Sequence, residues 1–222
     1  MTHKSSASEG FWEPHYAATQ PGIGGPGPVL VDAVRALTSG RALDLGCGDG
    51  GDALWLAERG WAVLTVDVSA TALTRVTDRA AAAGVGDRVR TERHDLDATF
   101  PQGEFDLISA QYLLSPVEFD RPAMLARAAA ALRPGGVLLV VDHASVAPWS
   151  WADPDTVFPT PEQLLAEFRL DPELWQEAMA ENRDRVAGGP GGQRATVTDT
   201  ILTLTRKSPP SDHLTRPGVQ HT

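Results

Sequence analysis

The sequence contains one cysteine, Cys47, among 222 residues. A single cysteine excludes an intramolecular disulfide framework and a zinc site built from several cysteines. Lysine is almost as scarce, because Lys4 and Lys207 are the only two, and the formal net charge is −10. Nucleic-acid binding needs a clustered basic surface, and an anionic membrane attracts the same kind of cluster. The composition therefore favours a small-molecule partner over a nucleic acid or a membrane.

Long apolar runs are also missing. The N-terminus, MTHKSSASEG, lacks the apolar core of a signal peptide, and no run reaches the length of a membrane span. No spacing among His, Asp and Glu indicates a metal site. With 42% hydrophobic and 22% charged residues, we expect one globular, cytoplasmic domain with a substantial core.

Glycine and proline concentrate at residues 19–28, TQPGIGGPGP, which are too rich in both for regular structure. A short aromatic helix is expected before this loop at 11–18, and a helix with one apolar face is expected after it at 29–40. We therefore expect an N-terminal segment over 1–28, a main domain over 29–206 and a disordered tail over 207–222.

From residue 41 onward, apolar strands alternate with helices. Strands are expected at 41–45, 61–67, 88–95, 105–113 and 137–144, with helices at 51–60, 69–84, 121–136 and 160–168. This alternation predicts a parallel sheet with ligands at the carboxyl edge of its strands. The strand-like segment 196–205 and the loop GGPGG before it indicate a hairpin. Its partner at 174–187 has helical propensity but is assigned as a strand, because a hairpin needs two.

The stretch ALDLGCGDGG, residues 42–51, places glycines directly between the first strand and a helix. Gly46, Gly48 and Gly51 satisfy the dinucleotide-binding pattern G-x-G-x-x-G, and Asp67 ends the next strand, 21 positions after Gly46. A phosphate loop of the G-x-x-x-x-G-K-S/T type is excluded, because no lysine follows the glycines. The motif alone leaves dinucleotides and other nucleosides as alternatives.

Acidic residues at the ends of three successive strands discriminate between these ligands. Asp44 lies two residues before Gly46, Asp67 ends the second strand, and Asp95 follows the third. These acids would repel the pyrophosphate of a dinucleotide but suit a ligand that contains an ammonium and a sulfonium group. The sequence therefore favours a neutral or cationic nucleoside.

In their order and spacing, these segments resemble the motifs of class I S-adenosylmethionine-dependent methyltransferases. LDLGCGDG resembles their first motif, VDVS (66–69) their ribose-binding acidic segment, and HDLD (94–97) their adenine-side segment. FDLISAQYLL (105–114) resembles the strand facing the methyl donor, and LRPGGVLLVV (132–141) the entry to the fifth strand. FWEPHY (11–16) is similar to the helix before the core in small-molecule methyltransferases of the tellurite-resistance and thiopurine type.

The resemblance implies a Rossmann-like, doubly wound α/β fold with seven strands, mostly parallel with an antiparallel last strand. It implies S-adenosylmethionine as the cofactor, and methyl transfer by in-line displacement to an O, N or S atom of a small molecule. The implied cofactor-binding residues are Asp44, Gly46 and Gly48 at the methionine moiety, Asp67 at the ribose, Asp95 and Leu96 at the adenine, Gln111 near the methyl donor, and Cys47 and Val68 within the same segments. We interpret Cys47 as a small residue in a tight turn and not as a nucleophile.

His143 is the candidate catalytic residue. It follows the fifth strand at the carboxyl edge, and an imidazole ionises near neutral pH, as a general base requires. The alternative is a histidine hydrogen-bonded to the backbone. A base is needed only if the nucleophile arrives protonated.

Five aromatic residues are candidates for the acceptor site. Trp12 and Tyr16 lie four residues apart on one helical face, Tyr112 follows the fourth strand, and Trp149 and Trp151 lie on the loop PWSWADPD. Packing within the protein is the alternative for all five.

The segment SAQYLLSP (109–116) lacks the Asn/Asp-Pro-Pro-aromatic pattern of enzymes that methylate amide or adenine amino groups. Two other functions stay open. A nicotinamide-dependent oxidoreductase is disfavoured by Asp44 and by the absence of a substrate domain. A non-catalytic nucleoside-binding protein would have the same fold without turnover.

Overall fold

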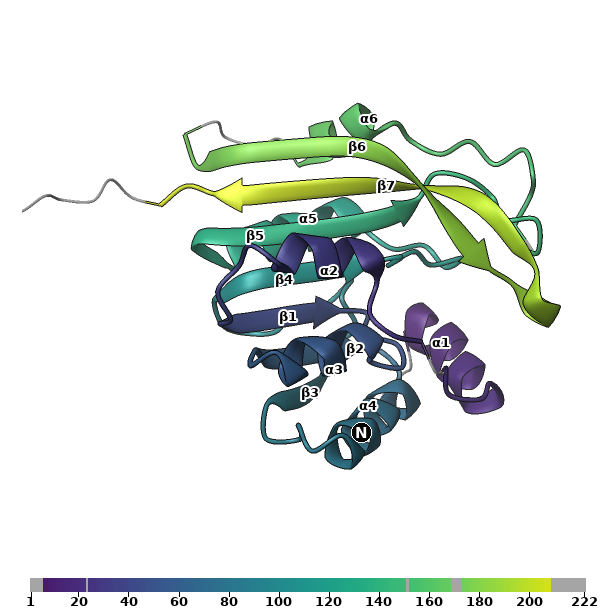
Figure 1. Cartoon of the computed structure of the whole chain (residues 1–222), viewed down its shortest axis with the longest axis horizontal. Coiled ribbons are helices and arrows are strands. Elements are labelled where there is room, and N and C mark those ends of the chain that lie inside the picture. The colour runs from purple at the N-terminus through teal and green to yellow at the C-terminus, as the bar shows by residue number, and fades with distance from the viewer. Residues whose placement is uncertain (1–5, 23, 151, 169–172, 209–222) are drawn as a thin grey trace, which may run out of the picture.

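A computed structural model describes residues 6–22, 24–150, 152–168 and 173–208 (Figure 1). The strands are β1 (Arg41–Leu45), β2 (Ala62–Asp67), β3 (Val89–Arg93), β4 (Phe105–Gln111), β5 (Leu132–His143), β6 (Trp175–Gly188) and β7 (Arg194–Arg206). The helices are α1 (Ala7–Ala18), α2 (Pro28–Val34), α3 (Gly51–Glu58), α4 (Ala70–Ala82), α5 (Arg121–Ala130) and α6 (Pro161–Glu167).

The strands form one seven-stranded sheet in the order β3-β2-β1-β4-β5-β7-β6. Neighbouring strands from β3 to β5 pair in parallel, and β7 pairs antiparallel with both β5 and β6. The order reverses between β1 and β4, which is the switch point where open α/β sheets bind ligands. The predicted Rossmann-like fold with an antiparallel last strand is confirmed.

Alternate residues of the central strands enter two separate cores. In β4, Leu107 packs into one core, whereas Ile108 and Ala110 pack into the other. Helices α2, α3 and α4 cover the first face, and α5 and α6 cover the second (Figure 1). Burial on both faces explains why the central strands are almost continuously apolar.

The structure corrects the ends of two expected helices. The helix expected at 29–40 ends at Val34, and the chain continues in tighter turns, in which the N–H of Arg35 donates to the carbonyl of Asp32 and the N–H of Leu37 to that of Val34. The helix expected at 121–136 ends at Ala130, and β5 begins at Leu132, which pairs with Phe105. Pro134 lacks the N–H that a continuing helix needs and its ring clashes with the preceding turn, so the chain turns into the strand earlier.

The predicted C-terminal hairpin is confirmed. β6 pairs with β7 along nearly its whole length, although residues 174–187 have helical propensity. Cross-strand pairing and burial against β7 outweigh that local preference. Of the tail expected over 207–222, only Lys207 and Ser208 are described, and the N–H of Lys207 donates to the carbonyl of Leu174.

Helix α1 starts at Ala7 rather than at residue 11, because the Ser6 hydroxyl accepts the N–H of Glu9 as an N-terminal cap. The helix lies at the carboxyl edge of the sheet beside α4 (Figure 1). Within the segments that the structure describes, no helix is both long and apolar enough to cross a membrane.

Glu13 attaches α1 to the start of α4. Its carboxylate accepts the hydroxyls of Ser69 at 2.7 Å and Thr71 at 2.5 Å, and the N–H of Thr71 at 3.2 Å. Arg75 on α4 also donates to the carbonyls of Tyr16 and Thr19. The expected N-terminal segment is therefore fastened to the rest of the fold by side-chain contacts.

We expect Glu13→Gln to loosen α1. The hydrogen bonds from Thr71, and then from Ser69, lower the pKa of Glu13 below 4.5 against the opposing effect of burial. The ionised form therefore stabilises the docked helix at neutral pH, and this stabilisation is lost as the pH falls through the lowered pKa. Loss of about 1 kcal/mol should speed amide hydrogen exchange in α1 about fivefold.

The matched control is Glu58→Gln, at an exposed position of α3, which should leave exchange in α1 unchanged. Equal exchange rates in Glu13→Gln and the native protein at neutral pH would contradict this role of Glu13.

Candidate functional site

The glycine motif forms a tight turn between β1 and α3. Gly46 and Gly48 have φ angles of 68° and 51°, a left-handed conformation that is easy only for glycine. A Cβ at Gly46 would lie 2.5 Å from the Leu113 side chain, and one at Gly48 would lie 3.0 Å from the Tyr16 hydroxyl. The turn therefore presents bare backbone to the carboxyl edge of the sheet.

Asp67 lies beside this turn at the end of β2 and is 7% exposed. Its Oδ2 accepts the N–H of Gly48 at 3.1 Å, and its Oδ1 accepts the N–H of Ser69 at 2.9 Å. Burial raises the pKa of Asp67, and these two hydrogen bonds act in the opposite direction. The hydrogen bonds fix the orientation of the carboxylate.

Two further carboxyl groups lie at the same turn. Asp44 on β1 is 4% exposed, and its Oδ2 is buried without a hydrogen-bond partner among the described residues. Asp52 on α3 accepts the N–H of Gly27 at 2.7 Å and the amide of Gln111. Burial raises the pKa of Asp44 well above its usual value, and the charges of Asp52 and Asp67 raise it further. A cationic ligand group would offset this unfavourable burial.

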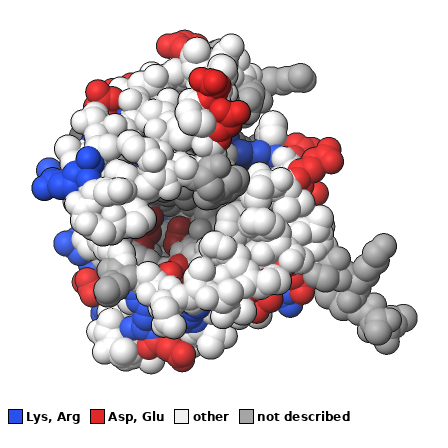
Figure 2. All heavy atoms as spheres, turned by 90° about the vertical axis from the view of Figure 1, so that its right-hand side faces the viewer, with Lys and Arg blue, Asp and Glu red and all other residues white. Residues whose placement is uncertain are grey.

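A cavity of about 100 Å³ lies at this edge, between α1, the ends of β2 and β3, and the segment after β4. Of the predicted site residues, its lining includes Trp12, Tyr16, Gly46, Asp67, Val68, Asp95, Leu96 and Tyr112. Figure 2 shows a hollow on this face with acidic atoms inside it. The structure thus brings together residues from five separate segments of the chain.

Four predicted cofactor residues, Asp44, Cys47, Gly48 and Gln111, are not among the residues that line this cavity. The side-chain amide of Gln111 donates to Asp52, so it connects β4 with α3. Burial raises the pKa of the Cys47 thiol well above its usual value, and Asp44 and Asp67 add to this effect. A protonated thiol is a poor nucleophile, which agrees with the interpretation of Cys47 as a turn residue.

A larger cavity of about 610 Å³ adjoins the first, and both are lined by Trp12, Tyr112, Leu114 and Ser115. The indole N–H of Trp12 donates to the Ser115 hydroxyl at 3.3 Å, so α1 meets the segment after β4 where the two cavities join. The predicted residues His143 and Trp149 also line the larger cavity. Trp151 lies outside the described residues, so its predicted role is untested.

A polar cluster around Asp199 of β7 forms one corner of the larger cavity. The Tyr112 hydroxyl donates to Asp199 Oδ2 at 2.8 Å, and the Arg185 guanidinium donates to the same oxygen. His143 Nδ1 lies 3.7 Å from Asp199 Oδ1, and its ring stacks on Tyr112 with centroids 4.5 Å apart. Burial disfavours the ionised carboxylate, but His143, Arg185 and Tyr112 outweigh burial and lower the pKa of Asp199.

Sequence reasoning does not select Asp199 or Arg185. The available signal is an acid in the middle of the strand-like segment TVTDTILTLT, where a charge is unusual. That this acid, Asp199 of β7, lies opposite His143 of β5 is visible only from the register of the sheet.

The family model that matches this chain describes a methyltransferase domain, Methyltransf_25, and covers residues 42–136. The chain contains a class I S-adenosylmethionine-dependent methyltransferase domain. The cofactor of this methyltransferase domain is S-adenosylmethionine. The match therefore decides among the ligands that the glycine motif allows, and the unpartnered, buried Asp44 oxygen fits the positive charge of that cofactor.

Two curated relatives illustrate the range of similar proteins. The methyltransferase domain is similar to nocamycin O-methyltransferase from Saccharothrix syringae, with 34% identity over 188 residues, 78% of this chain and 61% of that protein. It is also similar to ribosomal RNA small subunit methyltransferase C from Alcanivorax borkumensis, with 34% identity over 122 residues, 51% of this chain and 35% of that protein. The chain thus spans about a third to three fifths of these relatives' lengths.

Among solved structures, the methyltransferase domain is similar to one solved for the conversion of a disulfide bond into a thioacetal group during echinomycin biosynthesis. The two share 27% identity with a TM-score of 0.70, over 90% of this chain and 93% of that chain. The similarity therefore extends over nearly the whole chain.

The raised pKa of Asp44 predicts that cofactor binding is coupled to proton release. A cationic ligand favours the ionised carboxylate, so affinity for S-adenosylmethionine should rise with pH and fall as the pH drops below the raised pKa. Asp44→Asn should remove most of this dependence and weaken binding about 10–100-fold at alkaline pH. Titration calorimetry in two buffers with different ionisation enthalpies measures both the affinity and the released protons.

Asp87→Asn, at an exposed position, is the matched control and should bind like the native protein. A native affinity that does not vary with pH, with no protons released, would rule out this coupling.

Proposed function

We propose that this domain transfers a methyl group from S-adenosylmethionine to an O, N or S atom of a bulky small molecule in the larger cavity. The observation on which this rests is the pair of adjoining cavities with a shared wall at Trp12, Tyr112, Leu114 and Ser115. In-line displacement requires the nucleophile, the methyl carbon and the sulfur on one line. Two cavities that meet at one boundary suit that requirement.

The size and charge of the protein support a small acceptor. The larger cavity has a volume of about 610 Å³, within the range of sites for small molecules. A net charge of −10 without a basic run is unfavourable for binding RNA. Similarity to nocamycin O-methyltransferase extends over more of this chain than similarity to the ribosomal RNA enzyme.

The cofactor, when bound, supplies an electrophilic methyl group on a positively charged sulfur. We assign its methionine moiety to Asp44 and the turn at Gly46, because there a buried carboxylate oxygen and bare backbone lie together. Asp67 would accept hydrogen bonds from the ribose hydroxyls. Asp95 and Leu96 would bind the adenine, since both line the same cavity after β3.

His143 is the proposed general base for a protonated acceptor. The Asp199 carboxylate faces Nδ1, which favours a proton on that nitrogen and leaves Nε2 unprotonated. Stacking against Tyr112 restricts the ring further. The acceptor's proton would move to Nε2 while its lone pair takes the methyl group, and the electrons of the broken C–S bond stay on the sulfur. Asp199 is thus a positioning residue.

A binding assay followed by a turnover assay tests the proposed function. By calorimetry the protein should bind S-adenosylmethionine and not NAD, and Asp67→Ala should weaken binding by about 1–3 kcal/mol. Release of S-adenosylhomocysteine is then measured with a panel of apolar phenols, amines and thiols and with a ribosomal RNA fragment. Release with a small molecule supports the proposal. Release with RNA alone contradicts it, and binding without release indicates a non-catalytic nucleoside-binding protein.

His143→Ala should lower turnover of a hydroxyl acceptor about 10²–10⁴-fold and leave cofactor affinity nearly intact, because the proton acceptor is lost. Asp199→Asn should lower turnover less and should change the pH profile, because the amide no longer favours the same protonated imidazole nitrogen. Steady-state kinetics across the neutral pH range measure both effects. A folded His143→Ala protein with near-native turnover and an unchanged pH profile would refute the assignment.

A further inference from the structure

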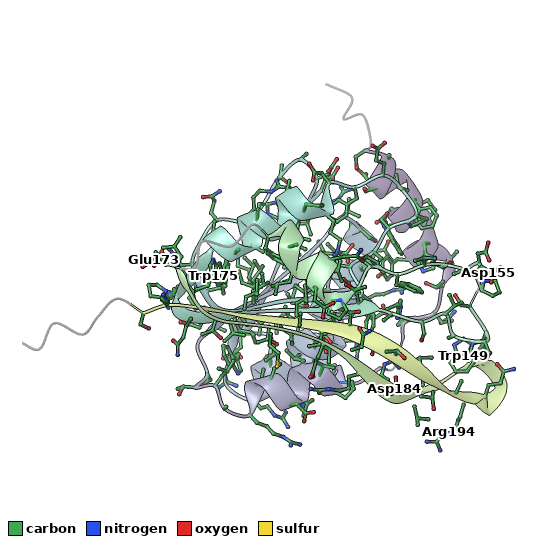
Figure 3. All side chains as sticks on the ribbon, turned by 90° about the horizontal axis from the view of Figure 1, so that it is seen from above. Trp149, Asp155, Glu173, Trp175, Asp184 and Arg194 are labelled. Carbon is green, nitrogen blue, oxygen red and sulfur yellow. The ribbon has the colours of Figure 1, made fainter. Side chains whose placement is uncertain are left out.

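The outer wall of the larger cavity is formed where two distant segments meet. Trp149, on the loop after β5, lines this cavity and lies beside the turn end of the β6–β7 hairpin (Figure 3). A Cβ at Gly189 in that turn would lie 2.3 Å, 2.5 Å and 2.7 Å from Cδ2, Cε3 and Cε2 of Trp149. The indole ring is therefore packed directly against the backbone of Gly189.

The backbone conformation does not explain why residue 189 is glycine. Its φ and ψ angles are −123° and −177°, an extended conformation that any residue adopts. Its N–H donates to the carbonyl of Gln193 at 2.8 Å, which holds it in the hairpin turn. The close approach of Trp149 is the feature that requires the missing side chain, as is usual where glycine permits contact with the backbone.

The alternation of side chains in β6 shows which side of the hairpin Gly189 faces. Arg185 and Ala187 line the cavity, whereas Val186 between them is 59% exposed. By this alternation the missing side chain of Gly189 would point to the cavity side of the hairpin, and the neighbouring backbone of Gly188 also lines the cavity. Trp149 lines the cavity and Gly189 does not, so the indole lies between the two.

We propose that the contact between Gly189 and Trp149 sets the acceptor size that this cavity admits. The Trp149 ring rests on the bare backbone of Gly189. A side chain at residue 189 would push this ring into the cavity and make the cavity smaller. The inference deepens the proposed function and rests on it for the identity of the ligand as a methyl acceptor.

The lining of the cavity indicates the chemical class of that acceptor. Among the described lining residues, Arg185 is the only Lys or Arg, and it is paired with Asp199. Apolar and aromatic residues, including Phe158 and Trp149, form much of the remaining wall. The wall therefore fits an uncharged acceptor with its nucleophile near His143 and an apolar ring system packed against Trp149.

The experiment compares two uncharged probes of different length, phenol and 4-phenylphenol. Their affinities are measured by calorimetry with the protein saturated in S-adenosylhomocysteine, so the assay does not depend on turnover. Gly189→Ala should reduce the preference for 4-phenylphenol over phenol by at least about tenfold, because the displaced indole overpacks the cavity. Gly86→Ala is the matched control, since Gly86 lines neither cavity and its Cβ would lie 3.7 Å or more from Ala81, and it should keep the native preference.

A double-mutant cycle tests whether the effect acts through Trp149. Trp149→Ala removes the ring that a Cβ at residue 189 would displace, so in that background Gly189→Ala should have no further effect on the preference between the two probes. Equal weakening of both probes by Gly189→Ala, or the same loss in the Trp149→Ala background, would overturn the inference. If the discrimination appears but no acceptor in the panel is methylated, the proposed function fails while the role of this wall stands.

Discussion

The carboxylate of Asp67 accepts the backbone N–H groups of Gly48 and Ser69, and the rest of the site depends on these two hydrogen bonds. The first joins the end of β2 to the glycine turn. The second fixes the residue that caps α4, whose hydroxyl in turn donates to Glu13 of α1. One buried acid thereby connects the turn, a helix start and the helix that covers the cavity. A substitution of Asp67 would therefore affect the glycine turn, the start of α4 and the position of α1.

The carboxyl groups of Asp44 and Asp199 have different hydrogen-bond partners, and this difference suits them to different roles. Asp44 has a buried oxygen without a partner among the described residues, and burial raises its pKa. Asp199 contacts Tyr112, Arg185 and His143, which together lower its pKa. A carboxylate that the protein leaves incompletely satisfied is suited to a cationic ligand. A carboxylate whose partners surround it is suited to holding side chains in place.

Helix α1 and the segment after β4 contribute to both cavities, so a movement of either would change both. The hydrogen bond from Trp12 to Ser115 joins them at the boundary between the cavities. Tyr112 has a positive φ of 50°, which is unusual for a residue with a side chain and is frequent at functional sites. Its ring stacks on His143, and Tyr112 lines both cavities. Both cavities thus share one wall, to which α1 and the segment after β4 contribute.

The sequence by itself determined the alternation of strands and helices, the glycine turn and the acids at the strand ends, because hydrophobic periodicity and turn chemistry are local properties. It misplaced the end of the helix before β5, and it did not show that Gln111 bonds to Asp52. Only the tertiary structure decided that Asp199 faces His143 and that Trp149 rests on Gly189. These contacts join segments far apart in the chain, and strand register and packing, which no local pattern encodes, bring them together.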